Sequence, residues 1–236
     1  MSKPTVSIII PTFQHATTIK VCLESILNQT HPPYEIIVVN DGSTDWTLTI
    51  LDEYRDRIRL INQPNLGGNI ARNNGFKVAT GKYVIFCDAD VRMRPYMLER
   101  MVRTLEEHPE VSYAYCQFRL GWKKFHSYKF SARRLRRINY IHTTSMIRRE
   151  HFPGFDERIN RFQDWDLWLT MLKNGHRGIF ISKTMFKIQT TNARVGISKW
   201  RPSALHMIPW RLIRWMPPAI KYYEEARKII AKKHGL

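Results

Sequence analysis

Cysteine is scarce in this chain of 236 residues, with Cys22, Cys87 and Cys116 as its three cysteines. They lie apart in apolar settings, which favours small core residues in a reducing compartment over a disulfide framework or a zinc site. Apolar runs of about 18 residues are also missing, which excludes a membrane-spanning helix. The first residues do not have the pattern of a signal peptide, so we expect a cytoplasmic protein.

Acidic residues are rare in the second half of the chain. Residues 1–110 hold 12 Lys and Arg against 13 Asp and Glu, whereas residues 111–236 hold 26 against 7. No acid occurs between Glu110 and Glu150. The net charge of +18 therefore belongs to the second half, and we expect that half to meet an anionic partner. Phospholipid, a lipid-linked phosphate, an acidic glycan and nucleic acid are the candidate classes.

The first 90 residues alternate between short apolar runs and amphipathic stretches. The runs at 6–10, 35–40 and 83–87 are typical of strands buried on both faces of a sheet. Apolar residues within 19–27 recur at helical spacing. This alternation predicts an α/β fold with a doubly wound, mostly parallel sheet and helices on both faces. Further elements are expected at 97–107 and 164–174 (helices), 111–119 and 142–148 (strands) and 219–233 (a basic helix).

Two carboxylates, Asp88 and Asp90, follow the apolar run at 83–87. Open α/β sheets bind ligands beyond the carboxyl ends of such strands. Two carboxylates this close repel one another, which favours a positive occupant. Mg²⁺ and Mn²⁺ are suited to this position because they prefer oxygen ligands, and their coordination shell can include substrate phosphates as well as carboxylates. The alternative is a strand that ends in a solvated aspartate turn. Polar loops at Thr12 and Asp41 should lie at the same sheet edge.

Five segments, in order, resemble the inverting family 2 glycosyltransferases with the GT-A fold. They are residues 7–13, 37–45, 71–75, 86–90 and 163–169. The resemblance implies a Rossmann-like GT-A sheet with a smaller acceptor-side region and a basic C-terminal extension. It also implies metal-dependent, inverting transfer of a sugar from a nucleotide-diphosphate sugar, with UDP favoured, to an acceptor hydroxyl. Cell-surface or lipid-linked glycan synthesis is the expected setting.

The resemblance assigns the donor site residue by residue. It implies that the nucleotide is held by Pro11, Thr12, Phe13, Asp41, Arg72, Asp88 and Ala89. It implies that Asp90 binds the metal, Mn²⁺ or Mg²⁺, while Asp88 binds ribose or reaches the metal through water. A turn residue is the alternative for Asp41, and a solvated helix charge is the alternative for Arg72.

Asp164 is the candidate catalytic base. Inversion by direct displacement needs a carboxylate that takes the proton of the acceptor hydroxyl. On a helix, Asp164 and Asp166 stand about 200° apart, so both cannot face one site, and the resemblance selects Asp164. An acidic first helical turn favoured by the helix dipole is the alternative. Gln163, where the family usually has Glu, and Trp165 are candidate acceptor contacts, although Trp165 could instead serve only in packing.

The resemblance also divides the chain into three parts. Residues 1–110 are expected to bind the nucleotide sugar, and 111–190 to form an acceptor-side subdomain that carries the base. Residues 191–236 are expected to form a flexible loop and a basic, tryptophan-rich segment. In the family a His near this loop often completes the metal site. The residues that this chain offers there are Asn192, Arg194 and His206, and none is assigned as the ligand.

A peripheral membrane location is predicted from charge and aromatic content. Trp and Arg alternate between Trp200 and Trp215, a composition typical of segments that lie at a membrane interface. We therefore expect the chain at the inner face of the cytoplasmic membrane, on an anionic surface. The expected partners are a nucleotide-sugar donor and a glycan or lipid-linked acceptor, without nucleic acid.

Two other functions fit parts of the sequence. An apolar strand that ends in Asp-x-Asp also resembles haloacid-dehalogenase-like phosphatases, but three strands precede it here, whereas that family places it first. Phosphatase assays with and without a nucleotide sugar would separate the two. A basic nucleic-acid-binding protein would explain the charge but gives no reason for Asp41, Asp88, Asp90 and Asp164. DNA retention without nucleotide-sugar hydrolysis would support it.

Overall fold

The structure, a computed structural model, describes residues 6–190 and 217–236. The chain divides into two compact units, Met1–Thr190 and Thr191–Leu236. Asn192, Arg194, His206 and the stretch from Trp200 to Trp215, on which two of the predictions rest, fall outside the described residues. Within the described ranges no helix has the length and apolar character needed to cross a membrane.

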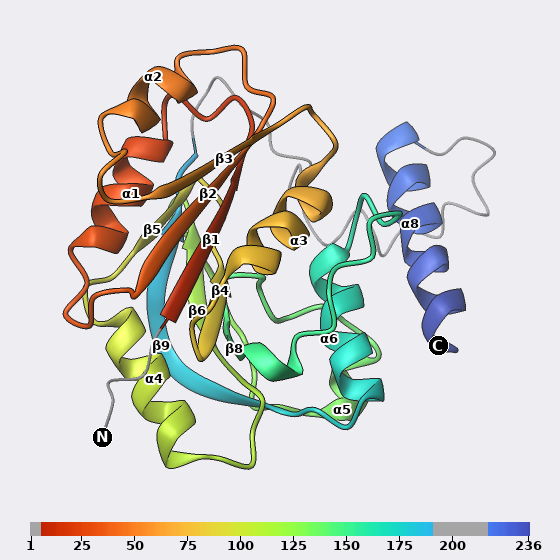
Figure 1. Cartoon of the computed structure of the whole chain (residues 1–236). Helices are drawn as coiled ribbons and strands as arrows, with labels where there is room; N and C mark the ends of the chain where they lie inside the picture. Colours follow the sequence, from red (N-terminus) through yellow and green to blue (C-terminus); the bar gives the residue numbers. More distant parts are fainter. Residues whose placement is uncertain (1–5, 191–216) are drawn as a thin grey trace. The chain divides into compact units, whose positions relative to one another are not determined.

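A nine-stranded sheet runs through the described part of the first unit (Figure 1). Its order is β3-β2-β1-β4-β8-β6-β9-β5, and β7 pairs with β6 beside this path. The first four strands are mutually parallel, β8 is antiparallel to both of its neighbours, and β9 is parallel to β6. The predicted mostly parallel α/β sheet is confirmed. The strands are β1 Val6–Thr12, β2 Glu35–Asp41, β3 Arg59–Gln63, β4 Tyr83–Phe86, β5 Val91–Met93, β6 Tyr113–Leu120, β7 Lys123–Phe125, β8 Met146–Arg148 and β9 Gly178–Ile188.

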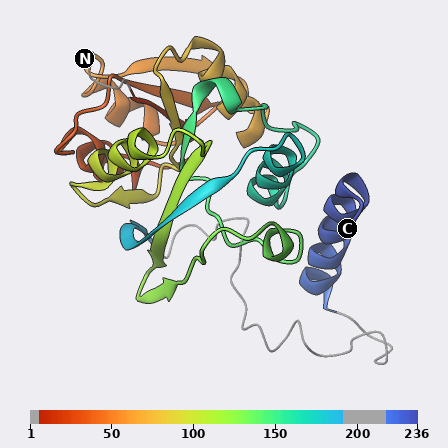
Figure 2. The same cartoon turned by 90° about the horizontal axis from the view of Figure 1, so that it is seen from below.

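Helices cover both faces of this sheet (Figure 1 and Figure 2). Alternate residues of β1, such as Ile8 and Ile10, join the apolar side chains of α1, α2 and α4 in one core. Ile9 faces the other side, where α3 packs. Strands buried on both faces need apolar residues at every position, which is why these runs are continuous. The helices of this unit are α1 Ile19–Leu27, α2 Thr47–Asp52, α3 Gly68–Val78, α4 Met97–Glu107, α5 Ala132–Leu135, α6 Gln163–Lys173 and the 3-10 turn η1 Arg149–His151.

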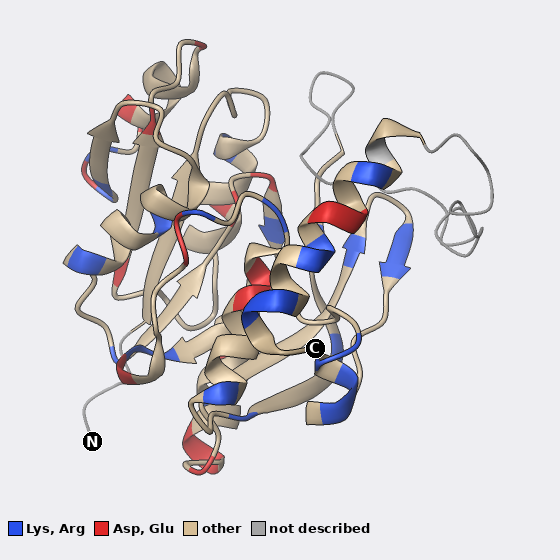
Figure 3. Ribbon diagram, turned by 90° about the vertical axis from the view of Figure 1, so that its right-hand side faces the viewer, with Lys and Arg blue, Asp and Glu red and all other residues tan. Residues whose placement is uncertain are grey.

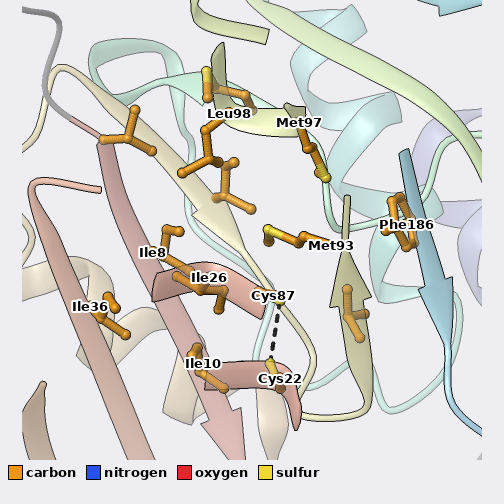
Figure 4. Packing of buried hydrophobic residues seen from close by; sticks show 14 of the residues in the cluster. Ile8, Ile10, Cys22, Ile26, Ile36, Cys87, Met93, Met97, Leu98 and Phe186 are labelled. Atoms are coloured by element: carbon orange, nitrogen blue, oxygen red, sulfur yellow. Dashed lines mark hydrogen bonds between the residues drawn. The ribbon is translucent and has the colours of Figure 1, made fainter. Parts of the chain in front are cut away.

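The three cysteines are free and buried, as predicted. Figure 4 shows Cys22 of α1 and Cys87, just after β4, facing each other across the core, with their sulfurs 3.9 Å apart. They pack among Ile10, Ile26 and other apolar side chains of the cluster. Burial raises the pKa of the Cys87 thiol well above its ordinary value, which makes it a poor nucleophile.

The region after residue 110 differs in detail from the prediction. Phe180 and Phe186 lie in a single strand, β9, whose pairing with β6 shifts register between Cys116 and Phe118. The three-residue strands β5 and β7 and the short helix α5 were not predicted, because such short elements have no periodicity to detect. In the second unit, α8 spans Pro218–His234, close to the expected basic helix.

Replacing Gly178 with Ala should lower the melting temperature. An added Cβ would lie 2.1 Å from Cε2 of Tyr113, and that ring is fully buried and packs on Trp168 at 4.6 Å between centroids. Overpacking of this kind costs about 1–3 kcal/mol or more. Thermal denaturation measures the effect, and a midpoint equal to that of the wild type would contradict this packing.

Candidate active site

The carboxyl ends of β1 and β4 form the centre of the candidate site. β1 pairs with β2 on one side and with β4 on the other, and all three strands are parallel. The sheet therefore grows away from β1 in one direction through β2 and β3 and in the other through β4. Open α/β sheets bind ligands at such a switch point, beyond the carboxyl ends of the strands.

Thr12 ends β1 with a buried hydroxyl group. Its side chain is 2% exposed, and its Oγ1 has no hydrogen-bond partner among the described residues. Burial of an unpaired hydroxyl is costly, so such a group is often explained by a missing ligand or water. Pro11 and Phe13, its neighbours in the chain, are half-buried at the same edge.

Asp41 holds the loop that leads into α3. Its Oδ1 accepts hydrogen bonds from Gln63 Nε2 at 2.7 Å and from the Leu66 N–H at 2.8 Å, and its Oδ2 accepts one from the Gly67 N–H at 2.9 Å. Gly67 has a φ of 102°, which side-chain-bearing residues rarely adopt. A carboxylate has about four acceptor positions, so Asp41 keeps the capacity for one further donor.

Asp88 forms an ion pair with Arg72 just beyond β4. Arg72 Nη2 donates to Asp88 Oδ1 at 2.7 Å, and the Arg72 side chain is 8% exposed. Burial by itself would raise the pKa of Asp88. The nearby Arg72, and after it His142, lower this pKa, and together the lowering effects are larger, so the pKa lies below its ordinary value. Asp88 is therefore anionic at neutral pH. Arg72 Nε is buried without a partner among the described residues, so the guanidinium retains a donor.

The residues at the end of β4 fit a hard divalent metal. Asp88 and Asp90 are both half-buried, with Ala89 fully buried between them. Across the described ranges, no cluster of three or more His, Cys, Asp and Glu side chains makes a complete metal site. Mg²⁺ needs few protein ligands because it keeps waters and takes substrate phosphate oxygens. Two carboxylates, one of them held anionic, are therefore enough protein ligands for the coordination shell of such an ion.

Two non-glycine residues with left-handed backbone lie beside the predicted site segments. Gln14 has a φ of 58° and Phe162 a φ of 61°. Each such residue costs roughly 1 kcal/mol or more, and strain of this kind is concentrated at functional sites. Gln14 donates to Thr44 Oγ1 at 2.7 Å and accepts from the Asp45 N–H at 3.0 Å, which fixes the loops after β1 and β2 to each other. Phe162 directly precedes Gln163, the first residue of α6.

Asp164 lies in the first turn of α6 and lines a cavity of about 260 Å³. Its Oδ1 accepts a hydrogen bond from the Trp165 N–H at 2.9 Å. Burial raises the pKa of the Asp164 carboxyl above its ordinary value, although Asn139 and His142 act to lower it. A general base works best with a pKa raised toward the operating pH. The cavity is also lined by Phe118, Phe125, His126, Tyr128, Asn139 and His142.

His142 connects the two parts of the site, and sequence reasoning missed it. Its ring packs on Phe118 at 4.8 Å between centroids. Its Nδ1 accepts a hydrogen bond from the Thr144 N–H at 3.0 Å, which places the proton of the neutral ring on Nε2. Burial lowers the pKa of His142, while Asp88 and Asp164 both raise it. The imidazole is thus close enough to act electrostatically on both carboxylates.

The other residues of the acidic motif are placed differently. Asp166 is 3% exposed and does not line the cavity. Trp165 is 4% exposed, and its Nε1 donates to the Leu135 carbonyl at 2.7 Å, so it packs against α5. Gln163 is half-buried and also lies outside the cavity lining. Acceptor contacts by Gln163 and Trp165 stay a prediction.

Residues 7–167 match the model of the family described as Glycosyl transferase family 2. The chain belongs to this family. The matched interval reaches into all five segments on which the resemblance was based. The family prediction is therefore confirmed, and it disfavours both the phosphatase and the nucleic-acid-binding alternatives.

Curated family 2 relatives match the chain over different lengths. The uncharacterized glycosyltransferase YibD of Escherichia coli (strain K12) is 43% identical over 110 residues, which is 45% of this chain and 32% of the relative. The chain thus spans about a third of the length of that relative. The putative teichuronic acid biosynthesis glycosyltransferase TuaG of Bacillus subtilis (strain 168) is 28% identical over 223 residues, 84% of each chain.

Solved structures share the fold of this family 2 chain. Residues 1–349 of S. aureus TarS in complex with UDP-GlcNAc superimpose with a TM-score of 0.71 at 20% identity, covering 97% of this chain and 71% of that TarS fragment. The mannosyltransferase PcManGT of Pyrobaculum calidifontis, in complex with GDP-Man and Mn²⁺, gives 0.67 at 22% identity, covering 98% and 70%. These likenesses confirm the predicted GT-A class of fold.

Proposed function

We propose that this chain transfers a sugar from a UDP-linked sugar to an acceptor hydroxyl with inversion, in the synthesis of a cell-surface or lipid-linked glycan. The observation that carries the proposal is that Asp164 and His142 line one cavity, while Asp88, which affects the pKa of His142, is held by Arg72 at the end of β4. This arrangement supports a donor site at the switch point of the sheet and an acceptor site in the cavity, since transfer between two substrates requires the two sites to be near each other.

Several contacts support binding of the nucleotide at the switch point. The remaining acceptor capacity of Asp41 suits the ring N–H of a uracil-like base. The buried hydroxyl of Thr12 and the spare donor of Arg72 suit ribose and phosphate oxygens. TarS contains UDP-GlcNAc and PcManGT contains GDP-Man in their complexes, which supports a nucleotide sugar as the donor class.

Asp90 and Asp88 would hold a divalent cation, Mn²⁺ or Mg²⁺, together with diphosphate oxygens. When bound, the metal would supply Lewis-acid stabilisation of the leaving diphosphate. The Mn²⁺ in the complex of PcManGT supports this assignment. Arg72 holds Asp88 anionic and in place for that role.

Asp164 is the proposed base. The acceptor oxygen forms a bond to the anomeric carbon on the face opposite the diphosphate, and the bond from that carbon to the diphosphate oxygen breaks. The proton of the acceptor hydroxyl passes to the Asp164 carboxylate. Attack from the opposite face inverts the anomeric configuration. The cavity beside Asp164 would hold the acceptor, because aromatic walls such as Phe118 and Phe125 suit the apolar faces of a sugar ring.

Replacing Asn139 with Ala should move the acid limb of the pH profile to higher pH. Asn139 lowers the pKa of Asp164, so its removal lets burial raise that pKa further. A base must be deprotonated to act, hence kcat/KM should begin to fall at a higher pH than in the wild type. Ile138→Ala, at the same cavity, is the control without a polar group. An Asn139→Ala limb that is unchanged or moves to lower pH would contradict this role of Asp164.

A thermal-shift screen of UDP, GDP and dTDP with and without Mn²⁺ tests the donor assignment. A ligand that binds only the folded state raises its stability, by about 2.7 kcal/mol at 100 times its Kd. We expect the largest rise with UDP and Mn²⁺ together. If none of the three nucleotides changes the melting temperature in either condition, the proposed function is wrong.

A further inference from the structure

The β6–β7 hairpin ends in an exposed tryptophan. Trp122 is 90% exposed, the highest value among the large hydrophobic side chains of the described residues. It directly follows Gly121, whose φ of 58° forms the turn between the two strands. A whole indole held in water at the tip of a hairpin adds nothing to the folded core. Trp is enriched where proteins meet the headgroup region of a membrane.

The stretch of chain that contains this tryptophan has basic residues and no acidic ones. Ten Lys and Arg and no Asp or Glu lie between Glu110 and Glu150. Figure 3 shows blue and no red on the strands of the hairpin and on α5. None of the exposed basic residues of this stretch takes part in the ion pairs found among the described residues. They are Arg119, Lys124, Lys129, Arg133, Arg134, Arg136, Arg137 and Arg149.

The hairpin and α5 border the Asp164 cavity. Phe118 of β6 and Phe125 of β7 stack at 4.9 Å between centroids and line it. Tyr128 lines it as well, and the guanidinium of Arg134 in α5 lies 4.5 Å from the centre of that ring. A flat partner that contacts both elements would therefore lie beside the cavity in which the acceptor is proposed to bind.

We infer that the hairpin and α5 form a docking surface for an anionic phospholipid membrane, with Trp122 seated at headgroup level. The exposed Arg and Lys would contact the lipid phosphates, and the indole would enter the interface between them. This surface deepens the proposed function because it would present a lipid-linked acceptor to the cavity. Docking itself depends only on the hairpin and α5.

The exposed indole favours a membrane over a soluble polyanion. A soluble polyanion would use the positive charges and gain little from a single apolar ring at a projecting tip. A bilayer offers both an anionic surface and an apolar boundary at the right depth. The contribution of Trp122 therefore decides between the two partners.

Co-sedimentation of the full chain with vesicles tests the inference. We expect binding to vesicles that contain phosphatidylglycerol, weakened by salt, and little binding to pure phosphatidylcholine. Trp122→Ser should weaken binding roughly tenfold or more. Trp46→Ser is the matched control, because Trp46 is 74% exposed but lies at the start of α2, outside the proposed surface. The Trp46→Ser variant should bind vesicles like the wild type. A Trp122→Ser variant that binds like the wild type would overturn the inference in favour of charge alone.

Two double variants distinguish binding through this local surface from binding that depends only on the total charge of the protein. One double variant combines Arg133→Glu with Arg137→Glu, and the other combines Arg55→Glu with Arg57→Glu. Both lower the net charge equally, and all four side chains are exposed. The first pair should weaken vesicle binding by more than about 50-fold, and the second only slightly. Equal weakening by both pairs would contradict a local surface. If the protein binds vesicles as expected but no nucleotide changes its melting temperature, the proposed function is wrong and the docking surface is still supported.

Discussion

Replacing Asp164 with Asn is expected to abolish sugar transfer while leaving donor binding intact. The change removes the base but keeps the size of the side chain, and it touches no residue at the nucleotide edge. General-base catalysis contributes about 10²–10⁴-fold, so kcat should fall by at least that factor while the nucleotide-induced thermal shift stays that of the wild type. Turnover of nucleotide sugar and the thermal shift are measured on the same preparation.

The stability of this variant provides a check against damage to the fold. Burial raises the pKa of Asp164 above that of an unfolded aspartate, so the ionisation of this group costs stability once the pH exceeds the unfolded pKa. Asn has no such cost, and Asp164→Asn should melt no lower than the wild type. Asp166→Asn is the comparison within the motif, since that side chain is buried outside the cavity. If Asp166→Asn loses turnover and Asp164→Asn keeps it, the assignment of the base is wrong.

Asp90→Ala is expected to remove the part of nucleotide binding that depends on a divalent metal. Asp90 lies two residues after Asp88 beyond the carboxyl end of β4, and it is the carboxylate that the family resemblance assigns to the metal. With UDP and Mn²⁺ at about 100 times the Kd, the wild type should gain about 2.7 kcal/mol, or roughly 5–10 °C in melting temperature. The variant should show only the small shift that UDP gives without metal.

Asp56→Ala is the matched control for this experiment. Asp56 is an exposed acid in the loop between α2 and β3, far in sequence from the strand ends of the site. Its substitution should leave both the melting temperature and the Mn²⁺-dependent shift unchanged. An Asp90→Ala variant with the full Mn²⁺-dependent shift would show that the metal assignment is wrong.

The edge of the sheet at Thr12, Asp41 and Asp88 could be predicted from the sequence because it is built from local patterns. The continuous apolar strands β1, β2 and β4 each carry their polar residue at the carboxyl end, so parallel pairing alone predicts that Thr12, Asp41 and Asp88 meet at one edge. The ion pair between Asp88 and Arg72 was not predicted. It joins a strand end to a helix and depends on how α3 packs on the sheet.

The cavity beside Asp164 could not be predicted from the sequence, for a physical reason. Its cavity is formed by β6, β7, the segment after β7 and α6, whose residues come together only through tertiary packing. His142 lies in no recognisable motif, and the signal that was available was its place in a stretch without acids, just before the short strand β8. The left-handed backbone at Phe162 gave no signal either, because the residue is not a glycine.

The release of nucleoside diphosphate from a panel of UDP-, GDP- and dTDP-sugars in the presence of Mn²⁺ tests the glycosyltransferase assignment most directly, since water can replace an unknown acceptor. The wild type should release UDP from a UDP-sugar, and Asp164→Asn should release it at no more than about a hundredth of that rate. Release by both proteins at the same rate, or release from no sugar in the panel while UDP with Mn²⁺ also gives no thermal shift, would contradict the assignment.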